Sequence, residues 1–183
     1  MKKLFFLAVL FISLNAAAQT EQGSSLIGGS FNIKTGENSS LVAFNPTYGY
    51  FFADNFTVGA NLGFNYSKMG EVKNTEFGIG PFARYYIGVA NTRPFLATEV
   101  SFLSQNTKTP TTDIKNNGTS FLFGLGFAAF INETVAVEGL TGYSYSKYKN
   151  TEGSGGFNLR LGFGLYFNRN TMNSLRTNVM GQN

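Results

Sequence analysis

The stretch from Phe56 to Ser67, FTVGANLGFNYS, alternates between two kinds of side chain without a break. Every second residue from Phe56 to Tyr66 is apolar or aromatic, and the residues between them are glycine or small and polar. A period of two is that of a β-strand with two different faces. Because the polar face is small and uncharged, we expect it to line a crowded interior. The apolar face is then turned toward something other than water.

The composition excludes several classes of protein. The chain has 183 residues, no cysteine and no histidine, and 13% of its residues are charged, against roughly 25% in soluble domains. It therefore lacks the commonest general base and the commonest metal ligand, and its loop carboxylates are scattered singly. We expect no catalytic residues, no enzyme activity, no cofactor and no metal. The net charge of +4 includes two lysines of an N-terminal leader and does not indicate nucleic-acid binding.

The N-terminus has the three parts of a secretory signal peptide. Lys2 and Lys3 form a basic region, residues 4–14 are largely apolar, and residues 16–18 provide an A-x-A cleavage site. The apolar run is about half of the roughly 20 residues that a membrane-spanning helix needs. We predict that residues 1–18 are a cleaved signal peptide and that the mature chain begins at Gln19, outside the cytoplasm.

Eight segments of the mature chain have strand character and match or exceed the roughly 9–11 residues of a tilted membrane-spanning strand. Tight turns at 53–55, 89–92 and 132–133 alternate with longer polar segments at 34–38, 68–74, 105–117 and 149–154. This alternation predicts an up-and-down meander that occupies residues 19–167. Residues 168–183 are a polar tail that we expect to be disordered or marginally helical. The predicted strands are 24–33, 39–52, 56–67, 75–88, 93–104, 118–131, 134–148 and 155–167.

The two faces of these strands differ along the whole chain. Large apolar side chains share one face, on which Lys147 is the first charged residue. An eight-stranded barrel has an interior just wide enough for side chains, so glycines on the other face would make room for paired charges. Arg84 and Glu99 lie on neighbouring predicted strands, as do Glu138 and Arg160, and we expect ion pairs within each neighbouring pair. The charged residues expected in this lumen network are Glu76, Arg84, Glu99, Glu138 and Arg160.

Two architectures compete for this pattern. A lipocalin-like soluble carrier would turn the apolar face inward around a ligand. Its glycine-rich outer face would then carry few charges, against roughly 25–35% charged residues on a soluble surface. In lipid every backbone amide must be paired internally, so membrane-spanning strands must close. We therefore predict an all-β fold, a closed eight-stranded antiparallel up-and-down transmembrane β-barrel with its apolar face outward.

The leader, the segments NPTYGYFFADNFTVGANLGFNYS and FGIGPFARYYIG, and the last strand GFNLRLGFGLYF resemble small outer-membrane β-barrel proteins of Gram-negative bacteria. These are eight-stranded barrels of the OmpA and OmpX type, in the outer membrane protein beta-barrel domain family. The resemblance covers nearly all of residues 22–167. It implies a place in the cell outer membrane, contact with its lipid, and assembly by periplasmic chaperones and the barrel assembly machinery. Phe167 resembles the C-terminal aromatic read by that machinery, although residues 168–183 follow it.

Tyrosines are placed where an aromatic girdle would anchor the barrel at the lipid–water interfaces. The expected girdle residues are Tyr48, Tyr50, Tyr66, Tyr85, Tyr143 and Tyr145. For function we expect a structural or surface-interaction role, with an unknown extracellular ligand bound through the loops, of which 105–117 is the longest. The alternatives are a narrow pore with the Glu/Arg cluster as its constriction and, third, the soluble carrier.

Overall fold

The computed structural model describes residues 17–149 and 151–168. A short 3-10 helix, η2 (Ala17–Thr20), precedes eight strands. Most of the predicted signal peptide and nearly all of the predicted tail lie outside the described residues. The strands are β1 (Ser25–Gly36), β2 (Ser39–Ala53), β3 (Phe56–Met69), β4 (Val72–Tyr86), β5 (Thr92–Lys108), β6 (Asp113–Phe130), β7 (Val135–Tyr148) and β8 (Ser154–Phe167).

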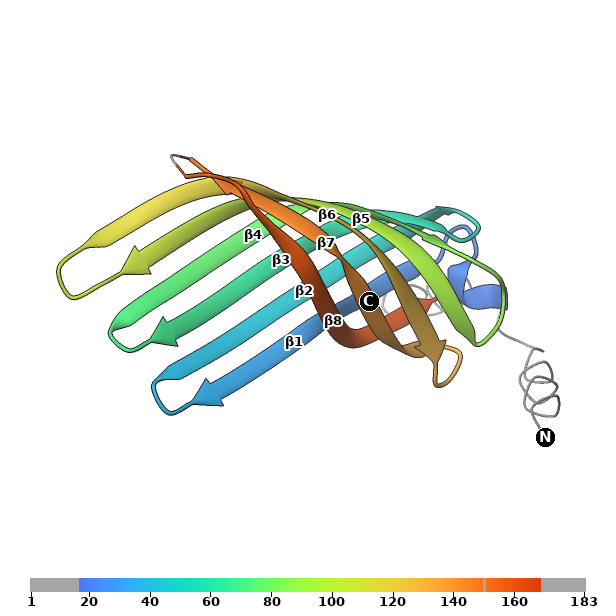
Figure 1. Ribbon diagram of the computed structural model, residues 1–183. Helices are drawn as coiled ribbons and strands as arrows, with labels where there is room; N and C mark the ends of the chain where they lie inside the picture. Colours follow the sequence, from blue (N-terminus) through green and yellow to red (C-terminus); the bar gives the residue numbers. More distant parts are fainter. Residues whose placement is uncertain (1–16, 150, 169–183) are drawn as a thin grey trace, which may run out of the picture.

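The strands form one closed antiparallel barrel in which each strand pairs with its neighbours in sequence and β8 returns to β1. This confirms the predicted fold class. The β2–β3, β4–β5 and β6–β7 turns lie at the same end as the start of β1 and the end of β8, and we call this end the base (Figure 1). The opposite end carries the β1–β2, β3–β4, β5–β6 and β7–β8 hairpins, and we call it the rim. No helix among residues 17–149 and 151–168 is long and apolar enough to cross a membrane.

The polar segments expected to be long loops are mostly paired strand, and that part of the prediction is wrong. The segment 105–117 forms the tip of a β5–β6 hairpin in which Gln105 pairs with Asn116 and Lys108 with Asp113. Only residues 109–112 connect the two strands. Polar side chains do not prevent ladder formation, because an antiparallel pair is held by backbone hydrogen bonds and needs no apolar face at a water-exposed tip.

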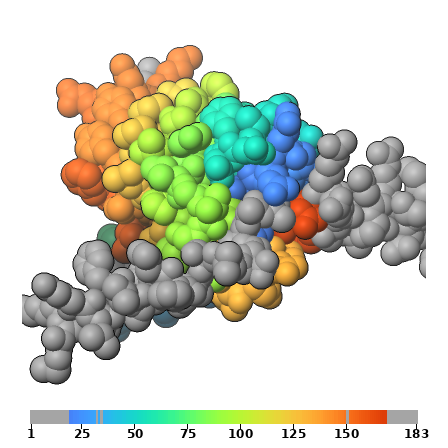
Figure 2. Space-filling view, turned by 90° about the vertical axis from the view of Figure 1, so that its right-hand side faces the viewer, coloured from blue at the N-terminus to red at the C-terminus, as the bar shows by residue number. Residues whose placement is uncertain are grey.

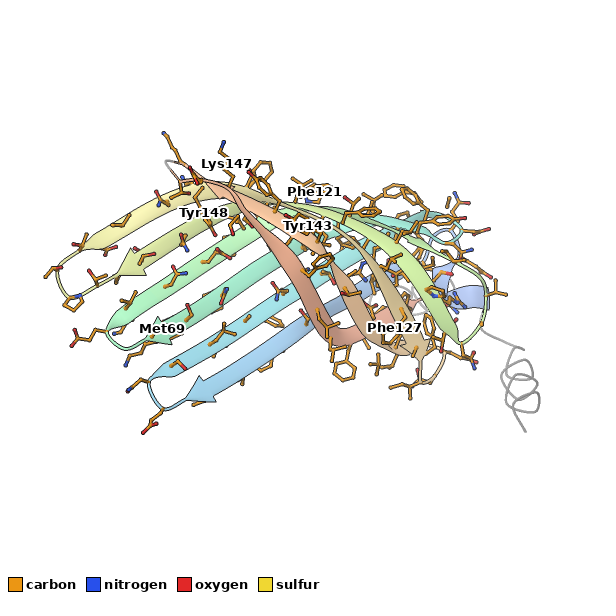
Figure 3. The ribbon with its side chains drawn as sticks, viewed as in Figure 1. Met69, Phe121, Phe127, Tyr143, Lys147 and Tyr148 are labelled. Atoms are coloured by element: carbon orange, nitrogen blue, oxygen red, sulfur yellow. The ribbon has the colours of Figure 1, made fainter. Side chains whose placement is uncertain are left out.

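The apolar face points outward on all eight strands. Phe121, Phe127 and Tyr143 extend away from the barrel (Figure 3), and each is roughly half exposed. Such a surface on a soluble protein would be an aggregation hazard, and it suits contact with acyl chains. The inward apolar face that a lipocalin-like carrier requires is not what these strands have. Exposed outward residues include Phe31, Phe44, Phe64, Phe77, Leu96, Phe102, Phe123, Leu125, Phe157, Leu159, Leu161 and Phe163.

The interior at the base is filled by a hydrophobic core that the sequence reasoning did not foresee. Phe51 near the end of β2, Tyr86 at the end of β4 and Tyr166 near the end of β8 are fully buried and pack ring against ring. Burying one such side chain stabilises the fold by about 1.5–3 kcal/mol. The core residues are Leu26, Phe51, Phe82, Tyr86, Phe95, Ala97, Leu122, Ala128, Ala136, Leu140 and Tyr166.

Glycines on the inner face make room for this core. A Cβ placed on Gly126 would lie 2.3 Å from the ring of Phe95 on the neighbouring strand. At the base turn between β2 and β3, Asn55 has a positive φ of 64°, a conformation in which Asn is enriched among non-glycine residues. The positions of glycine and asparagine thus follow from space inside the barrel and from a tight turn.

Candidate functional site

Two ion pairs cross the lumen above the aromatic core. Arg84 Nη1 on β4 lies 2.8 Å from Glu138 Oε2 on β7, and Arg160 Nη1 on β8 lies 2.7 Å from Glu99 Oε2 on β5. The pairing expected between neighbouring strands is therefore wrong, although the four residues do share the inner face. The register explains it: Arg84 lies opposite Ala97, and Glu138 lies opposite Gly162, so each charge is offset from the expected partner and reaches across the barrel.

The Arg84–Glu138 pair rests on the aromatic core. The guanidinium carbon of Arg84 lies 5.0 Å from the ring centroids of both Phe82 and Phe95. Tyr166 donates a 2.6 Å hydrogen bond to Glu138 Oε1, and the hydroxyls of Tyr86 and Tyr166 are 2.9 Å apart. A buried charge is tolerated only when it is paired and hydrogen-bonded, and these contacts supply both conditions for Glu138.

Rimward of these pairs lies a polar cavity of ≈ 220 Å³. All five residues of the predicted lumen network line it, together with asparagines and serines of β2, β3, β5 and β6. Two of its charged groups are incompletely paired within the described part of the chain: Glu99 Oε1 and Arg84 Nε are buried and have no hydrogen-bond partner there. Arg84 and Glu99 thus line the cavity, and each has one buried polar atom without a hydrogen-bond partner in that part of the chain.

Glu76 lies apart from the two ion pairs. Its Oε2 accepts a short hydrogen bond from the hydroxyl of Tyr148 at the rim end of β7. The sequence placed Glu76 in the lumen network but did not identify Tyr148 as its partner. Lys147 is exposed on the outer face and Tyr148 points inward (Figure 3). Because neighbouring residues of a strand face opposite sides, the position of Tyr148 next to an outward lysine was a signal in the sequence that its side chain enters the lumen.

The base is covered by a second polar cluster, which we call the base cap: Gln19, Thr20 and Arg93. Arg93 is 0% exposed and donates to Gln19 Oε1 at 2.8 Å and to Thr20 Oγ1 at 2.5 Å. Its guanidinium carbon lies 4.9 Å from the centroid of Phe130. Figure 2 views the molecule from the base. Sequence reasoning missed Arg93 because it falls at a predicted strand end, where a solvated charge is the ordinary expectation.

The tyrosines expected in the girdle occupy the outer face. Tyr48, Tyr50 and Tyr85 lie in the base halves of β2 and β4, and Tyr143 and Tyr145 lie toward the rim on β7. These five are exposed, and Tyr66 is partly buried. Tyr86 and Tyr166 have the opposite orientation and belong to the core. Two adjacent aromatics in one strand must face opposite sides, so Tyr85–Tyr86 and Phe51–Phe52 carried a signal for inward aromatics.

No group of three or more Asp and Glu residues that could hold a metal ion occurs within 17–149 and 151–168. What the described residues provide is a closed aromatic base, two ion pairs across the lumen and a small polar cavity that faces the rim.

Solved structures with the same fold include three outer-membrane or surface barrels. The N-terminal β-barrel domain of Pseudomonas aeruginosa OprF matches with 17% identity and a TM-score of 0.55, over 80% of this chain and 98% of that chain. Neisserial surface protein A matches with 15% identity and a TM-score of 0.56, over 79% and 96%. Pseudomonas aeruginosa OprG matches with 13% identity and a TM-score of 0.53, over 83% and 99%.

At such identities these likenesses show the fold alone. No curated protein sequence matches the chain significantly. The family comparison is more informative, since the model described as "Outer membrane protein beta-barrel domain" matches residues 4–167. With an apolar outer face, a closed eight-stranded barrel and this match over most of its length, the chain belongs to the outer membrane protein beta-barrel domain family and is a protein of the outer membrane.

Proposed function

We propose that this protein is a non-conducting outer-membrane barrel whose role is structural or interactive, and that it contacts its partners through the rim hairpins. The observation that carries the proposal is the packing of Phe51, Tyr86 and Tyr166 across the base. An ion entering from the rim would have to pass the Arg84–Glu138 pair and then this core. The polar cavity thus ends blind.

The rim supports the interactive part of the proposal. In outer-membrane barrels the periplasmic turns are short and the extracellular connections are longer. Counted with their polar paired arms, the rim hairpins are the larger connections here, which would place the rim at the cell surface. The β5–β6 hairpin is built from the two longest strands. Its tip carries an exposed ion pair between Lys108 and Asp113. Because the hairpins are paired, they would present a preformed surface, and binding would cost less ordering entropy than binding by a flexible loop.

The alternative is a narrow pore with the Glu/Arg cluster as its constriction. Planar-bilayer recording separates the two. The purified wild-type barrel should leave the current at baseline, whereas a Tyr86→Ala, Tyr166→Ala double variant, which empties part of the base, should give discrete openings. Stepwise conductance from the wild-type protein would refute the non-conducting barrel.

The interactive role is tested on cells. In one variant residues 106–115 are replaced by an Asn-Gly turn, which closes two-residue hairpins and leaves Gln105 opposite Asn116 as in the wild type. Cells that display the wild-type chain should adhere to immobilised matrix proteins or surface glycans, and cells with the shortened hairpin should lose most of that adherence. A variant shortened equally at the β1–β2 hairpin controls for general disturbance of the rim. If all three strains adhere no better than cells that lack the protein, only a structural role remains.

A further inference from the structure

The barrel closes along an unusually short seam between β1 and β8. Residues 25–30 of β1 pair with residues 162–167 of β8, and the pairing stops at Ser30 and Gly162. On its other side β1 pairs with β2 along its whole length to Gly36, and β8 pairs with β7 from Leu165 to Ser154. Toward the rim the two strands diverge (Figure 1). We call the unpaired stretch, 31–36 of β1 and 154–161 of β8, the open seam.

The open seam lies at the level of the lipid-facing side chains. If the register continued, Leu161 would lie opposite Phe31 and Leu159 opposite Ile33. All four side chains are apolar and exposed, as is Phe157, which at 86% is the most exposed of the large hydrophobic residues described. Unpaired backbone amides in hydrocarbon cost several kcal/mol each, so strand edges at this depth need a partner or polar cover.

The cavity of the lumen reaches this seam. Gly29 and Ser30 of β1 and Leu161 and Gly162 of β8 all line it. The backbones are close at the point where pairing ends, since a Cβ on Gly162 would lie 2.2 Å from the carbonyl oxygen of Gly29. Glycine is thus required at the last closed position, and directly beyond it the polar cavity and the lipid-facing surface meet.

The chemistry inside the cavity suits a polar head with both a cationic and an anionic part. Arg84 and Glu99 are 7% and 4% exposed, and their buried atoms Arg84 Nε and Glu99 Oε1 have no hydrogen-bond partner among the described residues. A polar head that displaces these side chains slightly could accept from Nε with its anionic part and donate an N–H to Oε1. The carboxylates of Glu76, Glu99 and Glu138 outnumber the guanidinium groups of Arg84 and Arg160 in the lining. A cationic group is therefore favoured beside the unpaired carboxylate oxygen.

We propose that the open seam is a lateral portal through which a single-chain zwitterionic amphiphile from the bilayer places its polar head in the cavity, while its acyl chain stays between Phe31, Ile33, Leu159 and Leu161. Pairing with a second copy of the chain would satisfy the strand edges but would leave Glu99 Oε1 and Arg84 Nε without partners. Because the aromatic core closes the base, the polar head of the amphiphile cannot pass from the cavity through the base. This site is independent of whatever the rim hairpins bind.

The first test asks whether the seam is open in a membrane. The chain has no cysteine, so any disulfide that forms in a double-cysteine variant joins the two introduced residues and reports that they are close together. A disulfide requires Cα atoms within about 7 Å. The Ile27→Cys, Leu165→Cys pair lies in the closed part of the seam and on the outer face, and it should oxidise rapidly in liposomes. The Ile33→Cys, Leu159→Cys pair should remain reduced, and equal oxidation of both pairs would overturn the portal.

The second test measures the ligand, with lysophosphatidylethanolamine as the probe and native mass spectrometry as the readout. One lipid molecule should bind to the wild-type barrel. One should also bind to the Ile27→Cys, Leu165→Cys variant after its two cysteines have been cross-linked by a long bismaleimide. The same cross-link in the Ile33→Cys, Leu159→Cys variant, made before the lipid is added, should weaken lipid binding by about tenfold or more. Binding that is unaffected by this lock would show that the lipid does not enter through the seam.

Two further arms identify the contacts. Glu99→Gln should weaken binding of the same lipid several-fold, whereas Glu71→Gln, at an exposed rim turn, should not. Free phosphoethanolamine should not compete at concentrations that match the lipid. If it competes equally, the acyl chain contributes nothing and the cavity takes a soluble polar ligand from the rim, which would refute the proposal. The seam lock remains decisive if Glu99→Gln does not fold.

Discussion

At the scale of single residues, the lumen depends on charges that compensate one another across the barrel. Arg84 and Glu138 are buried, and each satisfies the other through a contact of 2.8 Å. The Arg160–Glu99 pair is more open to solvent on the arginine side. Removing one partner of a buried pair is costly mainly because the remaining charge stays buried without a counter-charge. Both arginines should therefore matter: loss of Arg160 leaves the Glu99 side chain, 5% exposed, without a counter-charge, and loss of Arg84 leaves Glu138, 12% exposed, with only its hydrogen bond from Tyr166.

Arg84→Ala is expected to lower the free energy of unfolding by about 3–5 kcal/mol, measured by denaturant titration of the barrel refolded in lipid. Because the pair crosses the lumen, a double-mutant cycle should give a coupling of about 0.5–3 kcal/mol for Arg84 with Glu138. The cycle of Arg84 with Glu99, the partner expected from neighbouring strands, should give a smaller value. A larger coupling to Glu99 would contradict the observed pairing.

Gly126→Ala tests the space available inside the base. Its new Cβ would meet the Phe95 ring at 2.3 Å, so overpacking should cost about 1–3 kcal/mol. The matched substitution is Gly156→Ala on β8, where nothing lies within 4 Å of the added carbon and the change should stay within about 0.5 kcal/mol. The same denaturant titration serves for both, and similar destabilisation of the two variants would count against a packed base.

At the scale of elements, the rim hairpins are strands in regions where polar composition suggested loops. In the β5–β6 hairpin Thr109 N donates to Thr112 O at 2.8 Å. Bonded and non-bonded pairs alternate in an antiparallel ladder, so Thr107 and Ile114 form the next bonded pair and Lys108 and Asp113 do not. The two positions therefore differ in their tolerance of proline, which cannot donate a ladder hydrogen bond.

Limited trypsin digestion of the refolded barrel exploits this difference. Lys115 lies in the paired arm of the hairpin and should resist cleavage in the wild type. Ile114→Pro should open the ladder and expose the bond after Lys115, while the barrel body retains its heat-modifiable migration on gels. Asp113→Pro is the control and should leave Lys115 protected. Rapid cleavage at Lys115 in the wild type would mean that the segment is a loop after all.

At the scale of the whole molecule, the orientation of the two faces decides where the protein resides. Large apolar side chains surround the barrel, and charges and glycines lie inside. Phe123→Arg places a charge in the middle of the outer face of β6 and should cost about 2–4 kcal/mol in a bilayer, whereas Asn117→Arg, on the same face toward the rim, should cost about 0–1 kcal/mol. Folding titrations into liposomes provide the comparison. Equal costs would argue against a lipid-facing surface at Phe123.

Part of this organisation could be predicted from the residues alone. The alternation in 56–67 and its counterparts determined strand identity, the outward face and hence a closed barrel, because period-two patterning and backbone pairing in lipid are both local constraints. The inner position of Arg84, Glu99, Glu138 and Arg160 follows from the same parity. Adjacent aromatics such as Tyr85 and Tyr86 also required one ring inside.

The partners inside the lumen were decided by tertiary structure. Which carboxylate meets Arg84 depends on strand tilt and stagger around the closed barrel, and these are properties of all eight strands together. The base cap, in which Arg93 on β5 binds Gln19 and Thr20, depends on a segment far away in the sequence. The early end of pairing between β1 and β8 likewise concerns the first and last strands, whose register no local pattern can encode. The sequence by itself thus determined which side of each strand faces lipid, and closure of the barrel decided which inner groups touch and where the wall stays open.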